Sequence, residues 1–289
     1  MYPTFFEFQG MGFHMWGLML MFAFSGAILV THNRAQKVGI DPDDLVPFYQ
    51  IAVIAAIAGS RLLHFVFAEP ELFFSNPMVF FDPARGGFAF YGGAIFGTLF
   101  GSWYLRWKKI PILKFIDVAT PTMMLGLCLG RLGCFFAGCC HGAAVTATQT
   151  GTLLSFQGGS IVTVDAFPWM ALNFVDDVGV GSIHNVPIFP TQLWESTVGF
   201  TLFLILSWMW KNKRRFDGQI FAALLMMYPF LRSSIEVFRG DKVRGTDWLG
   251  LFSTSQLVSI PVFALGLGII LIYRKRGLSE EVPFVYSEE

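Results

Sequence analysis

Seven long apolar segments, separated by more polar stretches, run along the chain. A helix needs about 20 mainly apolar residues to cross the hydrocarbon core of a bilayer, and the segments approach or exceed that length. The second, fourth, fifth and sixth also carry ionisable residues, so we expect these four to line a cavity. The segments lie near Phe13–Val30, Val46–Ala68, Gly87–Trp107, Ile116–Gly138, Gln192–Trp210, Gly218–Phe238 and Gln256–Tyr273.

The composition narrows the class of protein. Hydrophobic residues make up 54% of the 289 residues and charged residues only 14%, which is too little charge for a soluble domain of this size. The formal net charge is zero, so no basic field exists to attract a nucleic acid, and we exclude that partner. Residues Met1–Glu7 lack the positive region of a cleavable signal peptide, so we expect the first span to be retained.

Lysine and arginine cluster after the odd-numbered segments, and this bias sets the orientation of membrane proteins. The sequence therefore predicts an all-α integral membrane protein, a single domain over residues 1–289 with seven transmembrane helices and the N-terminus outside. Residues 139–190 are expected to form an external loop or head between spans four and five, and residues 274–289 a cytoplasmic tail. Arg239, Lys242 and Arg244 break the rule, and we interpret their outward charge as a sign of anion binding.

An arginine near the end of the fourth segment carries the strongest functional prediction. Arg131 lies in an apolar run that ends at Gly142, and an ionised guanidinium within hydrocarbon marks a polar cavity or a ligand pathway. Its planar fork of donors matches the oxygens of a phosphate. Glycines at positions 126, 130 and 133 flank it, and they allow either close helix packing or room for a substrate chain. The sequence predicts an anion site within or at the edge of the bilayer.

A second polar group lies on the sixth segment. Arg232 and Glu236 are four residues apart and therefore share one helical face, with Arg239 one turn further along. As a structural device, the pair is neutral and lets polar groups enter the membrane. As a functional device, Glu236 orients an arginine whose remaining donors hold a phosphate. The two interpretations are compatible.

Other polar residues permit plainer interpretations. Arg61, considered by itself, is expected to extend its side chain toward the headgroups. Asp117 lies near the cytoplasmic start of the fourth segment, and we expect a structural role. Gln192, which follows Pro190 and Thr191 at a helix start, is predicted either to bind a headgroup or to cap the helix.

The cysteines leave three interpretations open. Cys134, Cys139, Cys140 and His141 are ligand types found in zinc sites, although their spacing fits no standard zinc pattern. A disulfide between Cys134 and Cys139 or Cys140 is the second interpretation. The third is that the thiols pack as small hydrophobic groups, as we also expect for Cys128. We predict no cofactor and no metal.

Several motifs in order resemble the prolipoprotein diacylglyceryl transferase family. The family pattern Gly-Arg-Ile-Gly-Asn-Phe, followed by Gly-Glu-x-x-Gly, is matched by residues 130–135 and 138–142. Asp-x-x-Ala-Pro is matched by residues 117–121, with one threonine interposed. The resemblance covers nearly the whole chain. Further matches are Gly59–Arg61 to Gly-Ala-Arg, Gly86–Gly93 to Gly-Gly-x-x-Phe-His-Gly-Gly, Phe189–Glu195 to Tyr/His-Pro-Ser/Thr-Gln-Leu-Tyr-Glu, Arg232–Arg239 to Arg-Phe-x-x-Glu-x-x-Arg and Ser255–Gln256 to Gly-Gln.

This resemblance implies a multi-pass enzyme of the bacterial cytoplasmic (inner) membrane. Such an enzyme moves the diacylglyceryl group of phosphatidylglycerol to the lipobox cysteine of a prolipoprotein signal peptide and releases glycerol phosphate. The partners are then phosphatidylglycerol, prolipoprotein signal peptides and membrane lipids. Residues with implied catalytic roles are Arg131, Arg232, Glu236, Tyr91 and His141. Residues with implied substrate-binding roles are Arg61, Gly92, Gly93, Cys134, Gly142, Gln192 and Arg239.

The chain departs from the family pattern at polar positions. Tyr91 replaces a histidine, Cys134 an asparagine and Cys139 a glutamate, and Trp16 stands where the family has an aromatic hydroxyl. A phenol with an ordinary pKa near 10 is a poor base at neutral pH. Either His141 or His14 removes the proton, or Tyr91 donates a hydrogen bond to the lipid, or the chain is a lipid-binding, redox-active or metal-linked paralogue. The retained residues Arg131, Arg232, Glu236 and Arg239 favour the enzyme.

Overall fold

The computed structural model describes residues 4–8, 11–82, 87–142, 152–157, 160–165, 172–174, 187–236, 238 and 254–275. Contacts divide the chain into two compact units. The first unit comprises Met1–Thr31 and Ile116–Ser279, and the second comprises His32–Phe115 and Glu280–Glu289.

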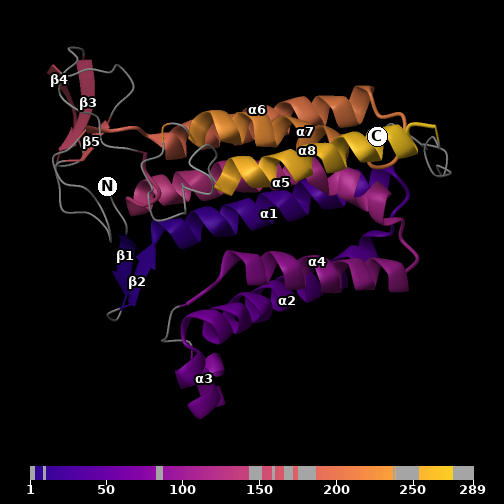
Figure 1. Ribbon diagram of the computed structural model, residues 1–289, viewed down its shortest axis with the longest axis horizontal. Helices are drawn as coiled ribbons and strands as arrows, with labels where there is room; N and C mark the ends of the chain where they lie inside the picture. The colour runs from indigo at the N-terminus through magenta and orange to yellow at the C-terminus, as the bar shows by residue number, and fades with distance from the viewer. Residues whose placement is uncertain are drawn as a thin grey trace. The chain divides into compact units, whose positions relative to one another are not determined.

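All seven predicted segments lie on helices (Figure 1). Four of the helices, α1, α2, α5 and α6, are long and apolar enough to cross a membrane, and the apolar part of α8 is shorter. Two shorter helices, α3 (Pro70–Ser75) and the 3₁₀ helix η1 (Pro77–Phe81), follow α2. The long helices are α1 (Met15–Lys37), α2 (Pro42–Ala68), α4 (Phe90–Trp107), α5 (Ile112–Ala137), α6 (Thr191–Asn212), α7 (Gln219–Glu236) and α8 (Thr254–Tyr273).

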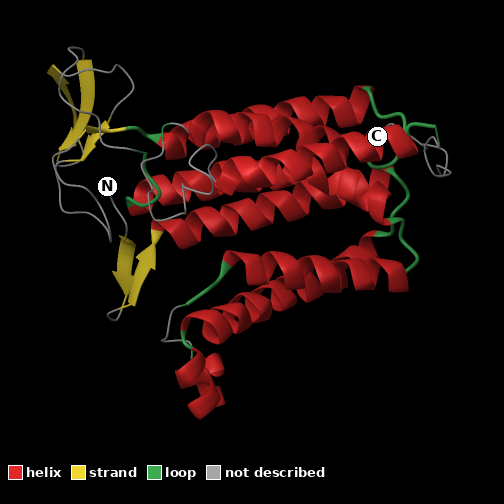
Figure 2. Ribbon diagram, in the orientation of Figure 1, coloured by secondary structure: helices red, strands yellow, loops and turns green. Residues whose placement is uncertain are grey.

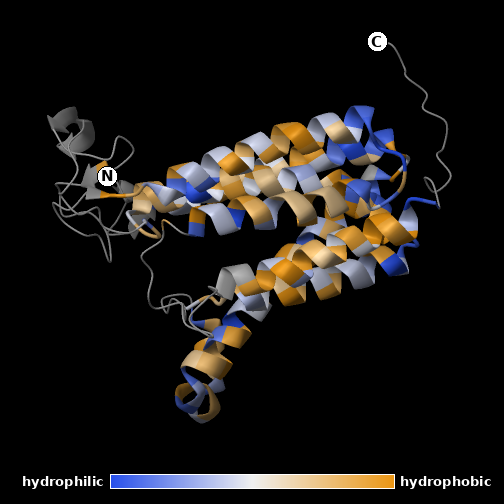
Figure 3. Cartoon of the chain, turned by 45° about the horizontal axis from the view of Figure 1, so that its top comes forward, coloured by the Kyte–Doolittle hydropathy of each residue, from blue (hydrophilic) through white to orange (hydrophobic). Residues whose placement is uncertain are grey.

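Hydrophobic side chains face outward along these helices. Phe24 and Leu29 of α1 and Ile54 of α2 are more than half exposed, and Figure 3 shows hydrophobic residues along the helices, with hydrophilic residues gathered near their ends. Exposed apolar surface on this scale marks contact with another apolar phase. The predicted helical fold and membrane character are confirmed.

Six short strands accompany the helices in the described chain. β1 (Thr4–Phe8) pairs antiparallel with β2 (Met11–His14). A second sheet has the order β4-β3-β5-β6, in which β3 and β5 run parallel. Figure 2 shows the strands of both sheets at one end of the first unit's helices. The second sheet contains β3 (Thr152–Gln157), β4 (Ser160–Asp165), β5 (Leu172–Phe174) and β6 (Pro187–Ile188).

These strands were not predicted from the sequence, although the sequence contains one signal for them. Thr152–Gln157 and Ser160–Asp165 are short runs that contain β-branched and aromatic residues, and only Gly158 and Gly159 separate them. Two such runs with a Gly-Gly connection are typical of a β-hairpin. They fall within residues 139–190, the segment predicted to be an external loop or head.

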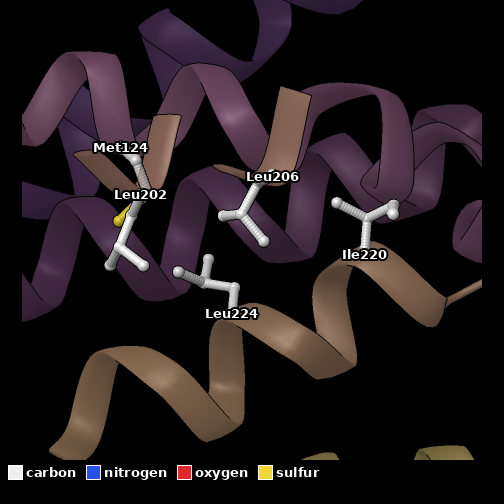
Figure 4. Close-up of a cluster of buried hydrophobic side chains, with 5 residues drawn as sticks. All are labelled: Met124, Leu202, Leu206, Ile220 and Leu224. Atoms are coloured by element: carbon white, nitrogen blue, oxygen red, sulfur yellow. The ribbon is translucent and has the colours of Figure 1, made fainter. Parts of the chain in front are cut away.

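The core of the first unit lies between α5, α6 and α7. Its buried side chains come from all three helices, and Figure 4 shows them converging. Among helices in lipid, such contacts stabilise through close packing rather than through removal of apolar surface from water. Gly199 brings α6 close to α5, because a Cβ there would lie 3.0 Å from the Met124 carbonyl oxygen. The five buried core residues are Met124, Leu202, Leu206, Ile220 and Leu224.

Two polar contacts also join helices of the first unit. The hydroxyl groups of Thr31 on α1 and Thr122 on α5 lie 3.0 Å apart and are buried. Ser196 of α6 donates to the carbonyl oxygen of Cys128 on α5 at 3.0 Å. The Cys128 side chain is buried against the same serine, as expected for a packing residue.

Asp117 of α5 holds the start of α7. The side chain is fully buried and accepts hydrogen bonds from the backbone N–H groups of Gly218, Ile220 and Phe221 at 2.9–3.0 Å. The Arg214 Nε lies 3.7 Å from the same carboxylate. The first N–H groups of a helix have no partner within it, so a carboxylate from a neighbouring helix stabilises α7 and fixes its position on α5. The expected structural role of Asp117 is confirmed.

Glycines mediate the packing of α2 and α4 in the second unit. A Cβ at Gly92 would overlap the backbone of Gly59, and one at Gly93 would lie 3.2 Å from the carbonyl oxygen of Ala56. Gly97 repeats the contact one turn later, against the Ala56 side chain. Small residues at four-residue spacing let two helix backbones approach closely. In this unit the glycine pattern builds a helix pair.

Candidate functional site

Two arginines and two glutamates from three helices form a continuous charged cluster in the first unit. The Arg131 Nε on α5 lies 2.6 Å from Oε2 of Glu195 on α6. The Arg232 Nη1 on α7 lies 3.6 Å from Oε1 of the same glutamate and 2.5 Å from Oε2 of Glu236. The exposed fractions of the four side chains lie between 3% and 18%. We call these four residues the arginine cluster.

Glu195 is the residue that the sequence analysis left out of the site. It has the least exposed side chain of the four, at 3%, and it contacts both arginines. A spacing signal was available. The buried polar or small residues of α6 recur at three- and four-residue intervals, which defines a polar face turned inward. They are Thr191, Gln192, Glu195, Ser196 and Gly199.

The arrangement of the cluster matters for binding. The charges of the two arginines and the two glutamates sum to zero, and buried charges in proteins require such pairing. The contact with Glu195 engages Nε of Arg131, so both of its Nη groups lie outside that ion pair. In the same way, Nε and Nη2 of Arg232 lie outside the pairs made by its Nη1. The cluster therefore presents oriented N–H donors from two guanidinium groups, a donor set suited to phosphate.

The loop after α5 lies against the start of α6. The backbone N–H of Cys139 donates to the carbonyl oxygen of Cys134 at 3.1 Å. The Gln192 side chain, which is 1% exposed, donates from Nε2 to the carbonyl oxygen of Cys139 at 2.8 Å. The Thr191 hydroxyl donates to that of Cys140 at 3.3 Å. Gln192 therefore anchors this loop, and no side-chain bond caps the α6 N-terminus.

Three of the four cysteines gather at the end of α5 and in the loop that follows it. The Sγ atoms of Cys134, Cys139 and Cys140 all lie within 4.8 Å of one another, and each residue is half-buried. None of the four cysteines forms a disulfide, and Cys128 is buried apart from the group. The hydrogen bond with Cys134, the one with Cys140 and then burial raise the pKa of the Cys139 thiol above its ordinary value. The sequence had left disulfide, metal and packing interpretations open, and the structure brings three reduced thiols together.

The remaining predicted residues of the first unit lie next to this loop. His141 is half-buried, and its Nδ1 lies 3.0 Å from the carbonyl oxygen of Gly142. The N–H of Gly142 donates to the carbonyl oxygen of Phe189 at 2.8 Å, which ties the loop to the chain entering α6. His14 is exposed and ends β2. Arg239 lies outside the described residues.

The glycines of α5 separate into two kinds. A Cβ at Gly133 would lie 3.1 Å from Cδ1 of Trp16, so this glycine serves close packing against α1. For Gly126 and Gly130, no atom of the described chain lies within 4 Å of the Cβ position. The two are four residues apart and share a helical face with Cys134. At these two positions, α5 therefore borders open space within the described part of the chain.

Arg61, in the second unit, does not reach outward. The residue is only 8% exposed, and its Nη2 donates to the carbonyl oxygens of Asp82 at 2.9 Å and Val79 at 3.3 Å. The guanidinium carbon also lies 5.4 Å from the centre of the Phe65 ring and 5.5 Å from that of Phe88. The expectation of a side chain extended toward the headgroups was wrong, because two backbone carbonyl groups, one in η1 and one directly after it, and two aromatic rings surround this cation.

The second unit also holds the residue that replaces the family histidine. Tyr91, in the first turn of α4, is 73% exposed, and its ring packs edge-on against Phe90. Gly92 and Gly93 follow it and pack α4 against α2. The phenol is thus accessible at the end of a rigid helix pair.

A hollow of about 640 Å³ lies at the opposite end of α6 from the arginine cluster. Four cationic side chains line it, in agreement with the clustering of lysine and arginine after odd-numbered spans. It is separate from the cluster and includes none of the predicted site residues. Its lining residues are Lys213, Arg215, Phe216, Gln219, Arg274 and Lys275.

Long apolar helices with a buried arginine–carboxylate cluster define a helical membrane protein with an anion-binding type of site. Residues 3–272 match the family model described as prolipoprotein diacylglyceryl transferase. The chain therefore belongs to the prolipoprotein diacylglyceryl transferase family, as the motifs indicated.

Similar proteins carry the corresponding name in full. A phosphatidylglycerol–prolipoprotein diacylglyceryl transferase of Clostridium tetani is 28% identical over 276 residues, which is 96% of this chain and 99% of that protein. The protein of the same name from Geobacter sulfurreducens is 30% identical, covering 95% and 96% of the two chains. The one from Streptococcus pneumoniae is 31% identical, covering 91% and 89%.

Proposed function

We propose that this protein transfers the diacylglyceryl group of phosphatidylglycerol to the cysteine thiol of a prolipoprotein signal peptide. Family membership supports the activity, and the relatives' names supply the two substrates. The single observation that carries the proposal is the position of Glu195, whose buried carboxylate contacts Arg131 and Arg232 together. A carboxylate in that position fixes two guanidinium groups as one anion-binding unit.

The reaction requires stabilisation of a departing phosphate. The cysteine sulfur attacks the glycerol carbon of the lipid, the carbon–oxygen bond to phosphate breaks, and glycerol phosphate leaves while the thiol proton passes to a base. The phosphodiester carries one negative charge and the product monoester up to two, so charge grows on the leaving group. Preorganised donors aimed at that charge lower the barrier because they bind it more strongly in the transition state.

Arg131 and Arg232 are the residues proposed to hold this phosphate. Their guanidinium groups come from α5 and α7 and are joined through Glu195, so the N–H groups outside the ion pairs are held in position before the lipid binds. Glu236 orients Arg232 from one turn along the same helix. The open face of α5 at Gly126 and Gly130 is proposed to receive an acyl chain.

Further roles, for the proton and for the headgroup, are proposed for residues of each unit by itself. His141 is proposed as the base, since its half-buried ring lies at the end of the loop that Gln192 anchors. Tyr91 is proposed to donate a hydrogen bond to the lipid, because an exposed phenol at a helix start is accessible to a headgroup. Substrate-positioning roles are proposed for Arg61, Gly92, Gly93, Cys134, Gly142, Gln192 and Arg239.

The proposed setting is the bacterial cytoplasmic membrane. All seven predicted segments are helical, and the lysine and arginine bias favours seven spans with the N-terminus outside. The arginine cluster and the loop after α5 would then lie toward the external face, which is where a secreted prolipoprotein presents its signal peptide.

The test is transfer by the purified full-length protein in detergent or nanodiscs. Phosphatidylglycerol labelled in its acyl chains is mixed with a lipobox peptide, and mass spectrometry detects the thioether product and released glycerol phosphate. A peptide with serine in place of the cysteine is the matched control, and it should remain unmodified. Binding of phosphatidylglycerol without product would contradict the enzyme and favour a lipid-binding paralogue.

A further inference from the structure

Three thiols at the end of α5 and in the loop after it lie close together. Cys134 comes from the last turns of α5, and Cys139 and Cys140 follow its end, yet all three Sγ atoms lie within 4.8 Å of one another. Each residue is half-buried, so a small ion can enter while most of the surrounding water is excluded. Three sulfurs from one short segment form a concave set of donors.

Hydrogen bonds hold the backbone that carries these thiols. Gln192 and Thr191 of α6 hold the carbonyl groups of Cys139 and Cys140, and the N–H of Cys139 donates to Cys134. Cys140 has a positive φ of 61°, in the left-handed region that non-glycine residues rarely adopt. A residue held in an unfavourable backbone conformation is expected where the positions of side chains serve a binding site.

The donor set selects the class of ion. Three thiolate ligands favour a soft cation, and in the described chain no carboxylate or histidine belongs to the same group of ligand atoms. With a metal–sulfur bond of about 2.3 Å, a trigonal site needs sulfurs roughly 4 Å apart, which falls within the observed 4.8 Å limit. Monovalent copper accepts three sulfur ligands without a fourth, whereas zinc usually takes four.

The thiols of this site depart from the family motif, and a cation lies near them. Cys134 and Cys139 stand where the resembling family motif has asparagine and glutamate, so the donor set belongs to this chain and the motif does not supply it. Arg131 lies three residues before Cys134 on α5, so its positive charge is on the same side of the helix as that thiol. A nearby cation offsets part of the negative charge that three thiolates bring together.

We propose that Cys134, Cys139 and Cys140 form a trigonal thiolate site for monovalent copper. On binding, each thiol releases its proton to solvent and forms one sulfur–copper bond, and copper stays in the +1 state, so no oxidant or reductant is needed. The proposal does not depend on the transferase activity.

The experiment is an anaerobic titration of reduced, purified full-length protein with Cu⁺ against bicinchoninate as a competing chelator. The expected result is one copper per chain, an ultraviolet sulfur-to-copper charge-transfer band and three sulfur neighbours in X-ray absorption. Cys134→Ser, Cys139→Ser and Cys140→Ser should each weaken binding more than about tenfold. Cys128→Ser is the matched control, because Cys128 lies on the same helix outside the group, and it should bind as the unchanged protein does.

Measurements on the unchanged protein guard against variants that fail to fold. Copper should protect Cys134, Cys139 and Cys140 together from alkylation, as read by peptide mass spectrometry. Equal affinity in the three serine variants and in Cys128→Ser would overturn the proposal. So would copper that leaves the three thiols reactive, or selective binding of Zn²⁺ where Cu⁺ fails.

Discussion

The Glu195 carboxylate lies 2.6 Å from Nε of Arg131 and 3.6 Å from Nη1 of Arg232, and so joins α5 to α7 through α6. Among the described ion pairs, Glu195 is the carboxylate that links Arg131 to Arg232. Within the described chain, Glu195, whose side chain is 3% exposed, is the carboxylate that contacts both guanidinium groups.

Replacing Glu195 by glutamine should impair transfer strongly. The amide keeps the shape but removes the charge that positions both arginines, so kcat/KM should fall about 100-fold or more. Glu236→Gln is the matched comparison, because Glu236 contacts Arg232 alone, and its loss should be smaller. Kinetics of both variants on the labelled lipid check this. If Glu236→Gln is the more damaging change, Glu195 does not organise the pair.

Replacing Asp117 by alanine should destabilise the fold. The change leaves three backbone N–H groups at the start of α7 without their acceptor and should cost about 2–3 kcal/mol. Thermal unfolding in detergent measures it. Asp43→Ala, at an exposed position of α2, should change stability by less than about 0.5 kcal/mol. Equal effects of the two substitutions would remove the capping role of Asp117.

Replacing Gly92 by alanine should loosen the pair of α2 and α4. The added Cβ overlaps the backbone of Gly59, which cannot rotate away, and we expect a loss of about 1–3 kcal/mol. In contrast, Gly268→Ala on α8 meets no described atom within 4 Å and should be neutral or slightly stabilising. The melting temperatures of the two variants test this prediction. An unchanged melting temperature in Gly92→Ala would show that α2 and α4 are not in tight contact there.

The ion pair of Lys108 and Asp44 should give the second unit an alkaline limit. The 2.7 Å contact is a hydrogen bond that raises the pKa of Lys108 above its ordinary 10.5. Because the folded-state pKa is the higher one, the pair stabilises fully below the ordinary pKa and loses its effect as pH rises through the raised value.

The measurement for this pair is the difference in melting temperature between the unchanged protein and Lys108→Met, taken from about pH 9 to about pH 12. The difference should shrink toward the alkaline end. Lys37→Met, at an exposed position, controls for general loss of positive charge. A difference that stays constant over this range would mean that the pair does not stabilise the folded state.

The sequence predicted the helices well because apolar length is the dominant requirement for a membrane helix. Every predicted segment, from Phe13–Val30 to Gln256–Tyr273, lies on a helix. The strands were not predicted, because short runs such as Thr152–Gln157 give a much weaker pattern of hydrophobic residues than the seven long apolar segments do. Asp117 was predicted correctly as structural, although its role at the start of α7 depends on a contact 101 residues away.

The site was predicted in part. The i, i+4 spacing placed Arg232 and Glu236 together, and the structure has that pair. The link from Arg131 to Glu195 joins two helices, so no local spacing indicates it. Arg61 was misjudged for the same reason, since the carbonyl groups that it binds come from a segment beyond its own helix.

The most direct test of the central claim compares Arg131→Ala with Arg106→Ala in the transfer assay. Arg106 is an exposed arginine near the end of α4 and controls for loss of a cation as such. If Arg131 holds the departing phosphate, kcat/KM for thioether formation should fall by about 100- to 1,000-fold in Arg131→Ala and stay near normal in Arg106→Ala. Near-normal turnover in Arg131→Ala, with the protein folded, would contradict the account.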